Sequence, residues 1–189
     1  TSTRERKTWN GEKDAEDPRN WPFKTKAFLT GFVSLYTLVS PMASSILSPA
    51  VTEISQELGI TNSVISAMVV SIQILAWAFG PLILSPLSES HYFGRKTVLD
   101  VSIWISFFFN LGCAFSRNTT QMMVCRFLGG IFGSCPLNVG AGVLSDLFDA
   151  DHRIYALAGF SLAPLLGPVI APLIAGFIVM KKDWRWVFY

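Results

Sequence analysis

The chain consists of long apolar runs separated by short polar segments. A helix needs roughly 20 residues to cross a bilayer core about 30 Å thick, and five of the runs are long enough while holding at most one charged residue each. The pattern therefore predicts five membrane helices and the beginning of another. We expect them at residues 27–47, 62–85, 97–116, 121–145 and 155–179, with the start of a sixth at residue 184.

The composition agrees with a polytopic membrane protein. Hydrophobic residues make up 51% of the chain and charged residues only 15%, a balance that is unusual for a soluble domain. Residues 1–26 are the exception, because they mix both charge signs with Gly and Pro. We expect them to form a disordered cytoplasmic tail, and we expect residues 27–189 to form one all-α transmembrane bundle.

Lysine and arginine are distributed unevenly between the connections, and this distribution predicts the orientation in the membrane. The tail carries seven basic residues, namely Arg4, Arg6, Lys7, Lys13, Arg19, Lys24 and Lys26. The loops expected on the same side add Arg95, Lys96 and Arg153, whereas the opposite side holds Arg117, Lys181, Lys182 and Arg185. We therefore expect a multi-pass protein with a cytoplasmic N-terminus. We also expect it in the plasma membrane, although the sequence shows no sorting signal.

Small residues recur every four positions in the last long run. They are Gly159, Ala163, Gly167, Ala171 and Ala175, and prolines follow the same spacing on the adjoining helix face. In a bilayer, such a stripe lets two backbones approach closely, and neighbouring helices satisfy the carbonyl groups that proline leaves free. The run predicts a kinked, closely packed membrane helix; ordinary packing is an equally good interpretation of the spacing alone.

Arg126 is the one charged residue inside the fourth run. A charge within a membrane helix usually faces a cavity or a partner, so Arg126 is a candidate functional residue. The alternative is that its side chain extends to the nearby membrane surface. Three buried polar residues, Gln73, Ser134 and Asn138, are candidates for lining a polar path, although helix packing explains most such residues equally well.

The connection between the second and third runs, Ser85–Leu99, combines turn-forming and charged residues. Gly94 permits a tight reversal, and Arg95 and Lys96 favour the cytoplasmic side. Glu89 could pair with a cation or cap a helix N-terminus. On physical grounds alone, an ordinary cytoplasmic hairpin explains the segment.

Residue patterns typical of enzymes are absent from the sequence. His91 and His152 are the only histidines, and neither has further ligands at metal-binding spacing. The sequence contains no phosphate-binding loop and no nucleophile elbow. We therefore expect no enzymatic activity, no cofactor, no bound metal and no nucleic-acid partner.

Five motifs in register resemble the N-terminal half of a major facilitator superfamily transporter, most closely the fungal multidrug-resistance-type proton antiporters. DPRNWP resembles the segment before the first helix, and PLSE with GRK resembles the loop between helices 2 and 3. Arg126 and Gly130 match the helix-4 pattern R-x-x-x-G. Residues 167–176 resemble the helix-5 antiporter motif, and WRWVF resembles the start of helix 6.

The resemblance implies roles for the matching residues. Glu89, Gly94, Arg95 and Lys96 would belong to a cytoplasmic gate, and Arg126 would take part in proton coupling. The helix-5 motif, which closes the outer side in the family, is represented here by Gly167, Pro168, Ala171, Pro172 and Gly176. The sequence departs from the family pattern in several places. Ser85 stands where the loop motif usually has glycine, and four residues instead of two separate Glu89 from Gly94. Alanine replaces a motif glycine at Ala171 and Ala175, and helix 1 has no acidic residue.

From this resemblance, we expect the chain to be an incomplete N-terminal portion of a proton-coupled exporter of small organic molecules. Its expected partners are the lipid bilayer, a small-molecule substrate, protons and a missing C-terminal half. Two alternatives stay open at this point. The chain could be a transport-incompetent truncated membrane protein, or part of a metabolite uptake carrier with the same fold.

Overall fold

The computed structural model describes residues 18–90 and 94–188, and within these ranges the chain contains helices and no strands. This confirms the all-α fold class. Five helical stretches of the described chain are long and apolar enough to cross a membrane, as the apolar runs predict. Residues 1–17, most of the expected tail, lie outside the described residues, as does His91.

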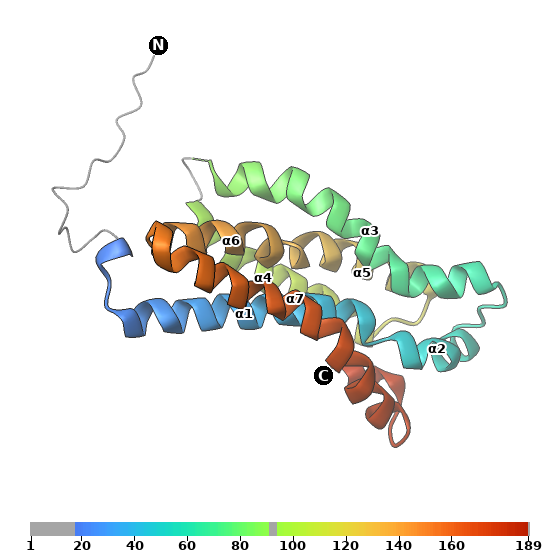
Figure 1. The fold of residues 1–189 in the computed structure, drawn as a ribbon. Coiled ribbons are helices and arrows are strands. Elements are labelled where there is room, and N and C mark those ends of the chain that lie inside the picture. Colours follow the sequence, from blue (N-terminus) through green and yellow to red (C-terminus); the bar gives the residue numbers. More distant parts are fainter. Residues whose placement is uncertain (1–17, 91–93, 189) are drawn as a thin grey trace, which may run out of the picture.

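The chain forms seven α-helices and three short 3-10 helices within the described residues. In chain order these are η1 (Pro18–Asn20), α1 (Phe23–Ser45), η2 (Ser48–Ala50), α2 (Val51–Glu57), α3 (Ser63–Ser88), α4 (Gly94–Ala114), α5 (Thr119–Gly133), α6 (Cys135–Leu147), α7 (Ala150–Val179) and η3 (Trp184–Phe188). Figure 1 shows α3 along one side of the bundle and α1 beside α7 on the other, with α4, α5 and α6 between them.

The helices extend beyond the apolar runs that predict them. α1 begins at Phe23, inside the expected tail, and α7 begins at Ala150. Polar and charged residues occupy these extra turns, because a bilayer including its headgroups is about 40–45 Å thick and its outer layers accept polar side chains. We therefore expect these helices to start in the headgroup layer rather than at the hydrocarbon boundary.

Two local features are not visible in the pattern of apolar residues. α2 is a helix of seven residues after α1, in the connection that was expected to be a loop. The fourth span is divided between α5 and α6, because Pro136 has no N–H to donate to the carbonyl of the preceding turn. The Ser134 hydroxyl donates to the Ile131 carbonyl at 2.7 Å and satisfies one acceptor at this break.

Glycines permit close contact at two helix interfaces. A Cβ atom at Gly130 in α5 would lie 2.7 Å from Ala76 Cβ in α3, and a Cβ atom at Gly167 in α7 would lie 2.7 Å from the Leu38 carbonyl oxygen in α1. Both distances are too short for atoms that are not bonded. The α3–α5 and α1–α7 pairs therefore pack with their backbones almost in contact, as small-residue stripes in membranes allow.

The two ends of the bundle are held together differently. We call the end with η1, the end of α6 and the start of α7 the η1 end, and the opposite end, with α2 and η3, the α2 end. A buried apolar cluster joins most elements at the α2 end. Its members are Leu47, Ala50, Ile54, Val69, Met122, Ala175, Trp184 and Val187.

Candidate functional site

Arg126 lies inside the bundle, on the face of α5 that is directed toward α1. Its side chain is 2% exposed. Nη2 donates a hydrogen bond to the Ala43 carbonyl at 3.0 Å, and the guanidinium lies 5.7 Å from the centre of the Phe188 ring. Arg126 therefore connects α5 to the end of α1 and to η3, and its side chain does not extend to the membrane surface.

The position of Ala43 explains how a cation is held at this depth. Ala43 lies in the last turn of α1, where backbone carbonyls lack partners within the helix and carry the negative end of the helix dipole. Arg126 thus acts as a side-chain cap for α1. Its Nε and Nη1 are also buried, and they have no hydrogen-bond partner among the described residues. The site can accept a further hydrogen-bond acceptor or an anionic group.

A cavity of about 440 Å³ lies beside this cation, between α1, α4 and η3. Ala43 and Phe188, which both contact Arg126, line it together with Tyr36, Ser106 and other side chains that are mostly apolar. The Asn110 side-chain amide donates to the Ser106 carbonyl at 2.9 Å. The cavity therefore combines an apolar wall with a few polar groups, as ligand pockets generally do.

The polar face of α1 is used for helix packing. Ser40 Oγ donates to the Gly133 carbonyl at 2.5 Å, and Thr37 Oγ1 donates to the Val33 carbonyl at 2.8 Å. Gly133 ends α5, so the first bond joins α1 to the break in the fourth span. The Thr37 bond lies within α1, and the same hydroxyl is 3.4 Å from the Pro136 carbonyl of α6. Both hydroxyls are thus directed to backbone carbonyls, and neither is a free donor toward a cavity.

The three candidate cavity residues occupy different environments. Gln73 is buried where α3 meets α5, and its Oε1 has no partner within the described chain. Ser134 is buried at the break between α5 and α6. Asn138 is exposed, and its Nδ2 donates to the Ser134 carbonyl at 2.8 Å. Their role in lining a transport path stays a prediction.

At the η1 end, the structure brings Arg95 to α6. Gly94 begins α4 with a positive φ of 64°, a conformation that glycine adopts without strain. The Arg95 guanidinium forms an ion pair with Asp146. It also lies over Gly142, where an added Cβ would be 3.0 Å from Arg95 Nη1.

The other two residues of the expected gate are not part of this contact. Glu89 and Lys96 are exposed, and neither forms an ion pair with a described residue. Asp146 is therefore the acidic partner of Arg95. Asp146 was not among the gate residues that the resemblance implies. Its place at the end of an apolar run, on the side expected for Arg95, was the available signal.

The residues of the helix-5 motif lie along α7 with different exposure. Gly167 and Ala171 are buried, with Gly167 against α1, and Ala175 belongs to the cluster at the α2 end. Pro168 is exposed, and Pro172 and Gly176 are half-buried. Gly159, at the start of the small-residue stripe, contacts nothing within 4 Å of an added Cβ. The stripe is therefore a packing surface from Ala163 onward.

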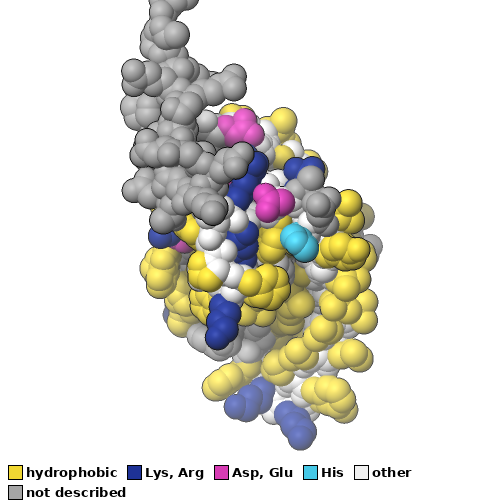
Figure 2. Space-filling model, turned by 60° about the vertical axis from the view of Figure 1, so that its left-hand side comes forward, with side chains coloured by type: hydrophobic (Ala, Val, Ile, Leu, Met, Phe, Trp, Pro, Cys, Tyr) yellow, Lys and Arg dark blue, Asp and Glu magenta, His cyan; other side chains and the backbone are white. Residues whose placement is uncertain are grey.

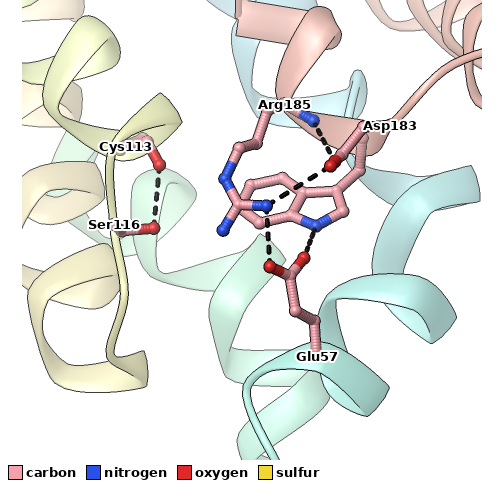
Figure 3. A network of polar contacts seen from close by, with 6 residues as sticks. Glu57, Cys113, Ser116, Asp183 and Arg185 are labelled. Carbon is pink, nitrogen blue, oxygen red and sulfur yellow. Dashed lines mark hydrogen bonds and ion pairs between the residues drawn. The ribbon is translucent and has the colours of Figure 1, made fainter.

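A polar network ties α2 to the start of the expected sixth helix (Figure 3). The Trp184 indole N–H donates to Glu57 Oε2, and Arg185 Nη1 contacts Glu57 Oε1 at 2.7 Å. Arg185 also pairs with Asp183 and lies 4.5 Å from the centre of the Trp184 ring. The hydrogen bond to Glu57 raises the pKa of Arg185, so its guanidinium stays charged. Sequence analysis did not identify this network, because Glu57 and Trp184 are 127 positions apart.

The described residues do not suggest metal chemistry. In residues 18–90 and 94–188, no group of three or more His, Cys, Asp or Glu side chains is placed to hold a metal ion. The arrangement around Arg126 is instead suited to binding a hydrogen-bond acceptor or an anionic group, because it combines a buried cation, two guanidinium nitrogens without a described partner and an adjacent cavity.

Comparison with known proteins identifies the family. Residues 33–189 match the family profile described as Major Facilitator Superfamily. The chain belongs to this superfamily. With its five apolar helices, the superfamily member described here is an integral membrane protein.

Similar superfamily proteins occur in fungi. An uncharacterized transporter of Schizosaccharomyces pombe is 40% identical over 96% of this chain and 37% of its own length. The efflux pump vrtL of Penicillium aethiopicum is 41% identical over 96% of this chain and 36% of its own length. The efflux pump radE of Floropilus chiversii is 35% identical over 96% of this chain and 33% of its own length. The chain therefore spans about a third of the length of these curated relatives.

Proposed function

We propose that this chain is the N-terminal portion of a transporter that exports small organic molecules in exchange for protons. Membership of the superfamily and the efflux pumps among the similar proteins support export. The observation that carries the proposal is Arg126, a buried cation with two free donors beside a cavity of about 440 Å³.

The coupling role follows from the chemistry of arginine. Its guanidinium keeps its charge at physiological pH, so Arg126 does not itself carry the exchanged proton. It favours the ionised form of any carboxyl group that comes close, because an opposite charge stabilises that form. A carboxyl group from the substrate or from the rest of the transporter would complete the site, and its protonation would release the interaction.

The cavity beside Arg126 also indicates where a sixth helix of the proposed transporter would pack. It lies between α1 and α4, and Val187 and Phe188 of η3 line one part of it. A sixth helix that continues from η3 would cover the apolar side chains of α1 and α4 there. Substrate selectivity would then arise between this half and the proposed C-terminal half.

The proposal includes an orientation, which follows from the basic residues. The η1 end holds Lys24, Lys26, Arg95, Lys96 and Arg153, so we assign this end to the cytoplasm. For an exporter of small molecules, we assign the plasma membrane. The Arg95–Asp146 pair then lies on the cytoplasmic side and ties α4 to α6. As part of a gate, this pair would break and reform as the transporter changes state.

The decisive experiment uses the full-length protein in proteoliposomes. Substitution Arg126→Ala is expected to lower efflux driven by a pH gradient at least about tenfold, equivalent to ~1.4 kcal/mol, while counterflow without a gradient persists. Arg117→Ala, at an exposed arginine near the same end of the bundle, is the matched control and leaves both activities unchanged. Proton-driven efflux that survives Arg126→Ala would contradict the coupling role, and uptake instead of efflux would contradict export.

A further inference from the structure

A second cavity, of about 530 Å³, opens at the η1 end, where α1 and α7 begin beside the end of α6. Its wall is largely aromatic, and two basic side chains complete it. The residues that matter here are Trp21, Lys26, Thr30, Phe148, His152 and Tyr155. This cavity is separate from the surroundings of Arg126, which lie toward the α2 end.

Trp and Tyr side chains indicate the depth of this cavity in the membrane. Trp21 and Tyr155 both line it, and Tyr155 is 78% exposed. Trp and Tyr are the side chains enriched at membrane–water interfaces, and α7 continues from Tyr155 to Val179, which is long enough to cross the bilayer core. We therefore place the cavity at headgroup level.

The polar groups of the cavity favour an anionic ligand. Lys26 Nζ donates to the Arg19 carbonyl at 2.6 Å and lies 5.7 Å from the centre of the Phe148 ring. These contacts hold the ammonium at the cavity and leave other N–H donors available, since an ammonium has three. His152 adds a donor, and Thr30 Oγ1 is buried without a partner among the described residues. The lining includes no acidic side chain.

The charge pattern of the surrounding surface is consistent with this interpretation. Figure 2 looks toward this end of the molecule and shows Lys, Arg and His side chains close to hydrophobic side chains, with Asp or Glu side chains among them. Asp146 on α6 is paired with Arg95, and Asp149, the residue before α7, is an exposed carboxylate that does not line the cavity. α1 and α7 both begin here, so the positive ends of two helix dipoles add to the charge of Lys26.

We propose that this cavity binds an anionic glycerophospholipid from the adjacent leaflet. Lys26 and His152 bind the phosphate group, and the aromatic wall of Trp21 and Tyr155 contacts the glycerol and the first acyl carbons. A free inorganic anion would leave the aromatic wall in contact with water, whereas a lipid covers it. Basic pockets between helices on the cytoplasmic side suit acidic headgroups for the same reason.

Trp21 provides the probe for a direct test, because it lines the cavity. The chain is placed in nanodiscs that contain either brominated phosphatidylserine or brominated phosphatidylcholine at the same mole fraction. Quenching at Trp21 is taken as the difference between the chain and its Trp21→Phe variant. We expect stronger quenching by phosphatidylserine. Equal quenching by the two lipids would overturn the proposal.

Two lysines allow a matched comparison. Lys26→Gln is expected to lower the preference for phosphatidylserine at least about tenfold, because it removes a hydrogen bond between two charged groups as well as the general attraction of one lysine to an anionic surface. Lys24→Gln removes the same charge from an exposed position that does not line the cavity, and it is expected to remove only the general attraction, a clearly smaller loss. Equal losses in both variants would mean general attraction to a basic segment and would overturn the proposal.

His152 and free phosphate provide two further tests of the lipid site. His152→Gln changes an exposed residue of the cavity and leaves Lys26 in place. This variant is expected to reduce the preference for phosphatidylserine, as Lys26→Gln does. A preference that is unchanged in both variants overturns the proposal.

Inorganic phosphate in large excess is expected to leave the quenching intact. If phosphate displaces the lipid signal, the cavity binds a soluble anion and the lipid assignment is wrong.

Discussion

At the scale of single residues, Arg126 shows how a cation is accommodated inside a membrane bundle. No carboxylate of the described residues contacts it, and burying an unpaired charge is costly. The last turn of α1 offsets part of this cost through the Ala43 carbonyl, and the Phe188 ring contributes a further favourable contact. The charge is stabilised by parts of the chain that are distant in sequence.

Glu57 allows a prediction at the same scale. Glu57→Ala leaves the Trp184 indole N–H without its acceptor in a side chain that is only 2% exposed, which costs about 1–3 kcal/mol of stability. Glu57→Gln keeps one acceptor oxygen and loses the ion pair with Arg185, so its cost is expected to be smaller, below about 1 kcal/mol. Thermal unfolding in detergent, followed by tryptophan fluorescence, measures both.

The control for this comparison lies in the same helix. Glu53 is exposed and forms no ion pair with a described residue, so Glu53→Ala is expected to change the midpoint temperature little. If Glu57→Ala and Glu53→Ala behave alike, the network at the α2 end does not stabilise the bundle.

At the scale of helices, two substitutions in α7 test whether the stripe of small residues packs along its whole length. Gly167→Ala places a methyl group 2.7 Å from the Leu38 carbonyl oxygen and forces α1 and α7 apart, with an expected loss of about 1–3 kcal/mol. Gly159→Ala, on the same stripe, meets no atom within 4 Å and is expected to stabilise the helix by about 0.5–1 kcal/mol.

Chemical or thermal unfolding of the two variants, measured side by side, distinguishes close packing from helix propensity. Opposite signs are expected. A stabilising effect of both substitutions would mean that α1 and α7 do not approach as closely as the structure indicates.

The helices also show what a sequence can reveal. Apolar run length is enough to predict five spans, because the bilayer sets the length of a helix. The seven-residue α2 is too short for that argument, and the break between α5 and α6 depends on a single proline, Pro136, and is accompanied by a local bond from the Ser134 hydroxyl to the Ile131 carbonyl. These features depend on local hydrogen bonds and on neighbouring helices rather than on mean hydropathy.

The candidate site was only partly accessible to sequence analysis for a related reason. Arg126 was identifiable, because a charge in an apolar run is conspicuous. Its acceptor at Ala43 is a backbone carbonyl 83 positions away, in a residue with no polar side chain. Contacts of this kind depend on how helices are arranged in space, and no residue type or spacing indicates them.

At the scale of the whole molecule, the Arg95–Asp146 pair connects α4 to α6 at the η1 end. Both side chains are partly exposed, so the pair contributes little to overall stability, and its effect is expected to be local. Asp146→Asn should speed amide hydrogen exchange in the first turn of α4 and the last turn of α6, and the charge-exchanged double variant Arg95→Asp with Asp146→Arg should largely restore protection.

Lys96→Gln provides the comparison, because Lys96 is exposed and forms no ion pair with a described residue. We expect it to leave exchange unchanged. Salt at about 1 M should reproduce part of the Asp146→Asn effect, since it screens exposed pairs. A double variant that exchanges as fast as Asp146→Asn alone would show that the charge pair does not hold the two helices together.

The apolar cluster at the α2 end fixes one end of α1 and of α7, so a rotation there moves their opposite ends most. Ala175 fixes α7 near one end, and the helix extends about 38 Å from there back to Ala150 at the other end. A rotation of about 5° around that cluster would displace the far end by about 3 Å, which is about the length of a hydrogen bond. Small adjustments near Trp184 are therefore magnified into displacements large enough to make or break contacts beside Lys26 and Phe148.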